Sequence, residues 1–124
     1  AAMIRGIGVD VVSVPRMAGV LDRRGTRFCA RVFTEGERAY CRSRAEPAQH
    51  YAVRFAAKEA ALKALGVPAG LSWHELEVVQ EAGAPRLKLH GRAAEAARAR
   101  RSGRLHLSLS HSAETAIAMV VAEE

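Results

Sequence analysis

The sequence predicts a single α+β domain. Its 124 residues suit one domain of ordinary size and fall short of two. The residue patterns place helices between one early strand and a late cluster of strands, an order typical of α+β proteins. Apolar residues make up 49% of the chain, which allows a packed core, although a domain this small buries only about two-thirds of its unfolded surface. Self-association is therefore plausible before any motif is considered.

The first expected strand covers residues 4–12 (IRGIGVDVV), which are rich in β-branched side chains. Gly6 and Gly8 interrupt it, and glycine within a strand is typical of a place where another backbone or a ligand comes close. Asp10 lies late in the strand, where an unpaired carboxylate would be costly. Taken alone, Asp10 is most simply interpreted as a cap of the following turn.

Two helices are expected to follow. Ser13 is a suitable cap for the first, with Pro15 in its first turn. That helix should run to about Arg24, where Gly25 stops it. The T-x-x-E pattern at residues 34–37 is typical of a capping box and predicts a second, shorter helix.

The longest helical pattern covers residues 47–65, with Gly66 as its stop. At about 100° per residue, small side chains gather on one side of this helix, namely Val53, Ala56, Ala57, Ala60 and Ala64. Such a smooth face lets another element pack closely. Glu59 and Lys63 lie on another edge, four residues apart, where they are most simply a surface ion pair.

The rest of the chain predicts strands with one intervening helix. The expected elements are strands at residues 72–80 and 86–89, a short helix at 91–101, and strands at 105–110 and 115–122. Gly83 and Pro85 predict a turn between the first two of these strands. The last strand, TAIAMVVA, is almost entirely apolar, and we expect it to be central or at a subunit contact.

The net charge of +6 points toward an anionic partner. Such a partner could be nucleic acid, an anionic membrane surface, a phosphorylated small molecule or an acidic protein. Arginines are concentrated in the first third of the chain and again at residues 98–104. The six aromatic residues are too few for a single-strand binder built on stacking platforms. A solvated basic surface is the simplest alternative.

The sequence predicts a cytoplasmic protein that is not attached to a membrane. No apolar run approaches the roughly 18 residues needed to cross a bilayer, and the N-terminus lacks the features of a secretory signal. Cys29 and Cys41 fit neither a disulfide framework nor a metal pattern. We place residues 1–124 in one domain and expect the two alanines before Met3 to be a remnant of cloning.

A few side chains are suited to chemistry. Asp10 and Glu59 come from separate elements and could meet around magnesium, which typically takes one or two protein carboxylates together with waters and substrate phosphate. Lys63, one turn from Glu59, would reach the same phosphate as a point charge. His111 ends a strand without a second metal ligand at zinc spacing, so a structural histidine and a functional one are both open.

Four blocks of the sequence follow one another over nearly the whole chain. The first, GIGVDVVSVPR, carries G-x-D-x5-R at Gly8, Asp10 and Arg16. The second, FTEGERAYC, carries F-T-x-x-E-x-x-Y, and the third, RFAAKEAALKALG, carries [WF]-x-x-K-E-x-x-x-K. The last is HLSLSHSAETAIAMVVAE. In this order, the blocks resemble the small, single-domain holo-(acyl carrier protein) synthases, a type of 4′-phosphopantetheinyl transferase.

This resemblance implies a fold, an antiparallel sheet with a long helix and shorter helices, and a magnesium-dependent reaction. A serine of an apo acyl carrier protein attacks coenzyme A, takes its 4′-phosphopantetheine arm and releases adenosine 3′,5′-bisphosphate. The carrier could belong to fatty-acid or polyketide synthesis. Asp10 and Glu59 match the magnesium ligands. Glu59 is also placed to accept the serine proton, and Lys63 would steady the pyrophosphate.

The resemblance also implies the binding residues. The expected contacts to coenzyme A are Arg54, Lys58, Lys63, Pro85, His111 and Ser112. The expected contacts to the acidic carrier, on a basic first helix, are Arg16, Arg23, Arg27 and Phe28. Family members of this size are homotrimers with sites between subunits, so His111 of one chain would face Asp10 and Glu59 of another. Val12 occupies the position of a second acid in the larger two-lobed transferases, which favours the small trimeric type.

Two other functions are alternatives to the transferase. A basic nucleic-acid-binding module predicts salt-dependent binding without magnesium, but gives no reason for Glu59 between Phe55 and Lys63. A trimeric scaffold without catalysis predicts that the acids contribute only to stability. The transferase explains all four blocks, so we expect neither nucleic acid nor a membrane as partner.

Overall fold

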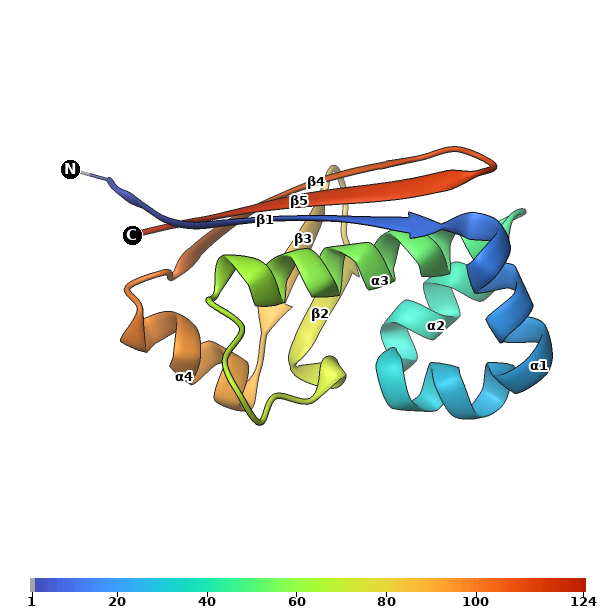
Figure 1. The fold of residues 1–124 in the computed structure, drawn as a ribbon, viewed down its shortest axis with the longest axis horizontal. Helices are drawn as coiled ribbons and strands as arrows, with labels where there is room; N and C mark the ends of the chain where they lie inside the picture. The colour runs from blue at the N-terminus through green and yellow to red at the C-terminus, as the bar shows by residue number, and fades with distance from the viewer. Residues whose placement is uncertain (1) are drawn as a thin grey trace.

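The computed structural model describes residues 2–124 and contains a three-stranded antiparallel sheet with one long helix along its inner face (Figure 1). The elements are β1 (Ile4–Ser13), α1 (Val14–Val32), α2 (Glu35–Arg42), α3 (Pro47–Ala64), a 3₁₀ turn η1 (Trp73–Glu75), β2 (Leu76–Gln80), β3 (Pro85–Leu89), α4 (Gly91–Ala99), β4 (Arg104–His111) and β5 (Thr115–Glu123). The sheet order is β1-β5-β4, and β2 pairs with β3 in a separate hairpin. The predicted α+β class is confirmed.

The contact between α3 and β1 brings two backbones very close together. Ala60 and Ala64 of α3 are fully buried, as the predicted smooth face requires. A Cβ placed on Gly6 would overlap the carbonyl group of Ala64, and one on Gly8 would overlap the carbonyl group of Ala60. The strand glycines therefore mark a close approach of another backbone, which here is the long helix.

The central strand β5 separates two different faces of the sheet. Its inward residues, Ala116, Ala118, Val120 and Ala122, are buried, whereas Ile117 and Met119 point outward and are 40% and 47% exposed. Val9 pairs with Met119 and Val11 pairs with Ile117, so these side chains share the outward face. We call Ile7, Val9, Val11, Ile117 and Met119 the outer sheet face; all five are exposed apolar side chains. The strand is central, as expected.

Helix α1 does not end at Gly25, which corrects the sequence prediction. Arg24 leaves helical geometry (φ −140°, ψ 25°), and a second helical segment then continues to Val32. Cys29 and Val32 are buried in that segment, and Phe28 packs near Phe33 with ring centroids 6.0 Å apart. Core packing therefore restores the helix beyond the kink at Arg24.

The predicted strand at residues 72–80 is also shorter than expected. Ser72 and Glu75 form a reciprocal capping box around the 3₁₀ turn η1, and the strand begins only at Leu76. Pro85, expected in the turn, is the first residue of β3 and pairs with Gln80. Helix α4 ends at Ala99, two residues before its predicted end.

The caps of α1 and α2 are those predicted from the sequence. Ser13 caps α1 by accepting a hydrogen bond from the backbone N–H of Arg16, and Thr34 and Glu37 form the expected capping box of α2. Both cysteines are free and buried, and burial raises the pKa of Cys41 to about 12. No helix within residues 2–124 is long and apolar enough to span a bilayer.

We predict that Gly8→Ala lowers the free energy of unfolding by roughly 1–3 kcal/mol, because the added methyl group must push β1 away from α3. Urea unfolding followed by circular dichroism measures this. Gly103→Ala is the matched control, since its Cβ meets nothing within 4 Å and should change stability by about 0.5 kcal/mol or less. Equal stability of the two variants would contradict the role given to Gly8.

Candidate active site

Asp10 and Glu59 line one cavity of about 300 Å³, although they come from different elements. Asp10 lies near the end of β1, and Glu59 lies in the middle of α3. The remaining lining residues are Val11, Val12, Ser13, Arg16, Met17, Val20, Phe28 and Phe55. Because Ser13 caps α1, the interpretation of Asp10 as that cap is wrong. The cavity therefore combines two acids with an apolar wall.

The electrostatics of this cavity favour a cation between the two acids. Burial raises the pKa of Glu59 above its ordinary value, the Asp10 carboxylate raises it further, and the Lys63 ammonium lowers it. Because both carboxylates line the same cavity, their negative charges repel each other. A positive charge placed between them would relieve that repulsion.

Lys63 reaches back to β1. Its ammonium donates a hydrogen bond to the carbonyl oxygen of Val9 at 2.9 Å and lies 3.4 Å from a carboxylate oxygen of Asp10. The side chain of Lys63 is 48% exposed, so its ammonium is accessible to a ligand. The expected ion pair along α3 is thus replaced by a pair across two elements.

The donor set of the cavity fits magnesium rather than a softer metal. Asp10 and Glu59 supply carboxylate oxygens, and residues 2–124 contain no group of three or more His, Cys, Asp or Glu that could hold a metal. Magnesium commonly binds through one or two carboxylates and completes its octahedron with waters and phosphate. Zinc sites, in contrast, require three or four protein ligands.

A second polar cluster lies at the start of α3. His111 forms a 2.8 Å hydrogen bond through Nδ1 with the Gln49 side-chain oxygen, and its ring lies 5.0 Å from that of His50. The Arg54 guanidinium stacks on Tyr40 at 4.1 Å. Burial lowers the pKa of His50, as do the nearby His111 and Arg54. We call these five residues the histidine cluster.

Arg54 has spare donor capacity in this cluster. Its side chain is 2% exposed, Nη2 is 3.5 Å from the Gln80 side-chain oxygen, and its buried Nε has no hydrogen-bond partner within residues 2–124. Buried polar groups are rarely left unpaired, so an anion or water beside Arg54 would complete its bonding.

His50 and Glu59 are nine residues apart on α3, or about 14 Å at 1.5 Å per residue.

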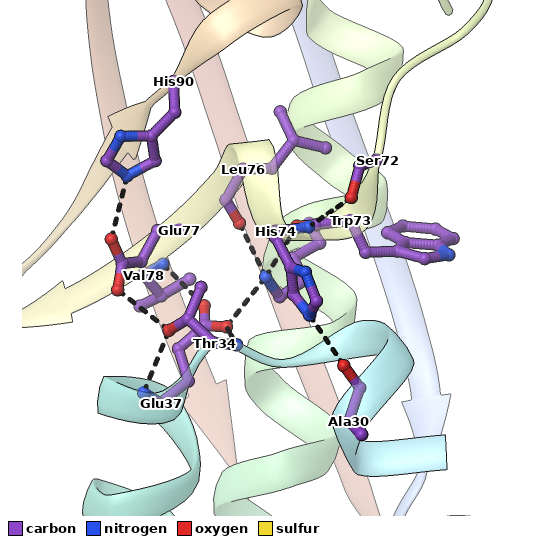
Figure 2. A network of polar contacts seen from close by, with 11 residues as sticks. Ala30, Thr34, Glu37, Ser72, Trp73, His74, Leu76, Glu77, Val78 and His90 are labelled. Carbon is purple, nitrogen blue, oxygen red and sulfur yellow. Dashed lines mark hydrogen bonds and ion pairs between the residues drawn. The ribbon is translucent and has the colours of Figure 1, made fainter. Parts of the chain in front are cut away.

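Lys58 is placed differently from the expected coenzyme A contact. It is fully buried and forms a 2.8 Å ion pair with Glu37. It also donates to the carbonyl oxygens of Trp73 at 3.0 Å and Leu76 at 2.8 Å. Figure 2 shows Glu37, Trp73 and Leu76. An ammonium has three donors, and all three are occupied within the chain. Within this chain the Lys58 ammonium therefore faces the protein interior and not the cavity of Asp10 and Glu59.

The other expected ligand contacts lie in turns and at strand ends. The Ser112 hydroxyl accepts hydrogen bonds from the backbone N–H groups of Glu114 and Thr115, each at 3.3 Å, in the turn after His111. Pro85 is half-buried at the start of β3. Ser112 is thus close to the histidine cluster in sequence. Pro85 pairs with Gln80, whose side-chain oxygen lies 3.5 Å from Nη2 of Arg54 in that cluster.

The expected carrier contacts lie on both halves of α1. Arg16 and Phe28 line the cavity of Asp10 and Glu59, and Phe28 packs against Phe55 with ring centroids 6.1 Å apart. Arg23 and Arg27 are exposed beside the kink. An open hollow of about 820 Å³ there is lined by Leu21, Asp22, Arg23, Arg24, Gly25, Thr26, Arg27 and Arg31. A basic surface therefore adjoins the acidic pair.

Sequence reasoning missed Gln49 and His50. His50 lies one turn before Arg54 on α3, so the four-residue spacing of two basic side chains was an available signal. Gln49 bonds to a residue 62 positions away, and no local pattern indicates such a contact.

The fold and this site belong to one class of protein. Residues 6–119 match the 4′-phosphopantetheinyl transferase superfamily, and the chain belongs to that family. The resemblance that the four sequence blocks indicated is therefore confirmed.

Its relatives within the class are holo-[acyl-carrier-protein] synthases. The one from Anaeromyxobacter sp. (strain K) is 52% identical over 124 residues, which cover 98% of this chain and 97% of the relative. The crystal structure of the Neisseria meningitidis synthase has a TM-score of 0.86 and 32% identity, covering 98% of this chain and all (100%) of that one. A Bacillus anthracis synthase, solved in complex with CoA (3′,5′-ADP), has a TM-score of 0.80 and 35% identity, covering 98% of each chain.

Proposed function

We propose that the chain transfers the 4′-phosphopantetheine arm of coenzyme A to a serine of an apo acyl carrier protein. The products are the holo carrier protein and adenosine 3′,5′-bisphosphate. The observation that carries this function is the pairing of Asp10 and Glu59 in one cavity beside Lys63. The relatives named above supply the reaction class, and the B. anthracis synthase was solved in complex with CoA (3′,5′-ADP).

Glu59 acts as the general base in this proposal. The serine oxygen forms a bond to the β-phosphorus of coenzyme A, and the bridging oxygen leaves with adenosine 3′,5′-bisphosphate. Glu59 accepts the serine proton, because it lines the same cavity as the metal-binding Asp10 of this proposal. Lys63, whose ammonium is half-exposed beside Asp10, balances charge on the leaving phosphate.

Asp10 and Glu59 are also the proposed magnesium ligands. Magnesium bound there would supply positive charge to the pyrophosphate of coenzyme A. The oxygen-only donor set and the mutual repulsion of the two carboxylates support this assignment. Val12, which stands where the two-lobed transferases carry a second acid after the metal aspartate, also lines the cavity and offers no ligand.

The histidine cluster is the proposed site for the nucleotide phosphates, with Ser112 and Pro85 as further contacts. Arg54 supports this because its buried Nε lacks a partner among the described residues. Along α3 of one chain, Arg54 of this cluster lies five residues, about 7.5 Å, from Glu59, and His50 lies nine residues, about 14 Å, from it. We propose that the cluster of one subunit serves the carboxylate pair of its neighbour, as the resemblance to the trimeric synthases implies.

The outer sheet face supports the homotrimer that this arrangement needs. Five exposed apolar side chains on adjacent strands form a patch of the kind that marks protein–protein contacts. Arg16, Arg23, Arg27 and Phe28 of α1 are the proposed docking residues for an acidic carrier protein. Positive charge at such a surface mainly raises the association rate and sets the orientation of the partner.

The first prediction concerns catalysis. Wild-type protein with coenzyme A, magnesium and an apo carrier should raise the carrier mass by one phosphopantetheine, and chelator should abolish the gain. Glu59→Gln should lower kcat by roughly 10²- to 10⁴-fold through loss of the base, and Asp10→Asn should weaken activation by magnesium. Mass spectrometry of both fatty-acid and polyketide carriers measures this.

Glu95→Gln is the control for those variants, because Glu95 is an exposed carboxylate on α4 outside the cavity. Its activity should equal that of the wild type. Absence of any mass gain with several carriers, or full activity of Glu59→Gln, would refute the proposed reaction.

The second prediction concerns assembly. Ile117→Asp places a charge in the outer sheet face and should convert a trimer, three times the 13.4 kDa chain mass, into monomers with retained circular dichroism. Light scattering after size exclusion measures the mass. Val67→Asp, at an exposed apolar residue away from the sheet, is the control and should remain trimeric. A monomeric wild type would rule the trimer out.

The third prediction concerns carrier docking. The double variant Arg23→Glu, Arg27→Glu should reduce kcat/KM for the carrier by about tenfold or more at low salt, with a smaller loss at high salt because screening weakens the interaction. Steady-state kinetics at two ionic strengths measure this. Arg98→Glu, an exposed arginine on α4, is the control. An equal loss of kcat/KM in the double variant and in Arg98→Glu would contradict the proposed role of α1 in carrier docking.

A further inference from the structure

Lys58 and Glu37 form a buried ion pair that the proposed reaction does not use. Both side chains are 0% exposed, and the ammonium lies 2.8 Å from Oε1 of Glu37. Glu37 belongs to α2 and Lys58 to α3, so the pair joins two helices through the protein interior. Buried ion pairs carry a large desolvation cost, and they persist only where further hydrogen bonds complete them.

Both partners are fully hydrogen-bonded within the chain. The Glu37 carboxylate accepts from the backbone N–H of Thr34 at 2.8 Å and, through Oε2, from that of Val78 at 2.7 Å. The other two donors of Lys58 reach the carbonyl oxygens of Trp73 and Leu76. Figure 2 shows how Glu37, Val78 and Leu76 converge from α2 and β2. The network fixes the Lys58 side chain from several directions.

The position of Lys58 in the chain gives this network a consequence for the active site. Lys58 directly precedes Glu59, and successive residues of a helix point about 100° apart. A rotation of α3 about its axis would therefore break the Lys58 contacts and swing Glu59 away from Asp10 together. On another side of α3, the contact of Ala60 with Gly8 sets the distance to β1.

We propose that Lys58, held by Glu37, is a positioning residue that fixes the rotation of α3 and so aims Glu59 at Asp10. This inference rests on the proposed function, since it concerns the same carboxylate pair. Lys58 acts through Glu59 and not on substrate, because its three donors are occupied by Glu37, Trp73 and Leu76. Removal of a group that orients a metal ligand typically weakens metal binding by about 10- to 100-fold.

The test measures Mn²⁺ binding directly, by electron paramagnetic resonance of the free ion, in the absence of substrates. Mn²⁺ is a suitable probe because it favours carboxylate ligands as Mg²⁺ does. Lys58→Met keeps most of the length of the side chain and removes its donors. We expect the Mn²⁺ dissociation constant to rise by about tenfold or more. Affinity for adenosine 3′,5′-bisphosphate, measured by calorimetry without metal, should stay within about twofold, because the histidine cluster is not altered.

Ala97→Gly is the matched control for stability. Ala97 is buried in α4, which carries no hydrogen-bond partner of Lys58 or Glu37 within the described chain. This variant should be less stable than the wild type, because glycine weakens a helix, yet bind Mn²⁺ equally well. Thermal unfolding of each variant shows whether it is folded at the temperature of the binding experiment.

The outcomes separate the inference from the function on which it rests. A folded Lys58→Met that binds Mn²⁺ like the wild type, while the wild type is active, overturns the positioning role alone. A wild type that binds no Mn²⁺ overturns the metal assignment and this inference with it. If Lys58→Met does not fold, Glu37→Gln replaces it, since it removes the charge of the pair but keeps its shape. That variant should weaken Mn²⁺ binding by about threefold or more, and unchanged binding would overturn the proposal.

Discussion

The close contact between α3 and β1 is the constraint on which the rest of the structure depends. Gly6 and Gly8 have no side chains, and Ala60 and Ala64 have only methyl groups, so the helix lies almost directly on the strand backbone. A pair of large residues here would increase apolar burial, but it would also move the helix outward. Asp10 and Glu59 would then no longer share a cavity. The small residues of the core therefore serve the site as well as the packing.

Much of the fold could be predicted because its signals are local. The β-branched run with two glycines, the T-x-x-E capping box and the alanine face each depend on residues within a few turns of one another. The predictions failed where distant packing decided the outcome. Helix α1 resumes after Arg24 because Cys29 and Val32 are buried by other elements. The late start of β2 is a different case, because the S-x-x-E pattern at Ser72 and Glu75 was present in the sequence.

In the candidate site, the sequence identified which residues matter but not the direction in which every side chain points. The sequence blocks identified Asp10, Glu59 and Lys63, and the structure brings these three side chains together. The same blocks could not show that Lys58 faces inward, because one residue along a helix changes direction by about 100°. Its acceptors are a carboxylate on α2 and carbonyl groups of η1 and β2, and all are long-range contacts. The hydrogen bond between His111 and Gln49 could not be predicted either, because these residues are 62 positions apart in the sequence.

If the carboxylate pair and the histidine cluster of one site come from different subunits, as proposed, the shape of the oligomer decides how many sites are complete. If every complete site combines one part from each of two neighbours, the number of sites equals the number of interfaces. A linear row of chains always has one interface fewer than it has chains, so one acidic half and one histidine half are left unused at its ends. A closed ring has equal numbers of both, and closed rotational symmetry is the usual outcome for soluble oligomers. Ring closure would then do more than bury apolar surface, because it leaves no subunit with an incomplete site.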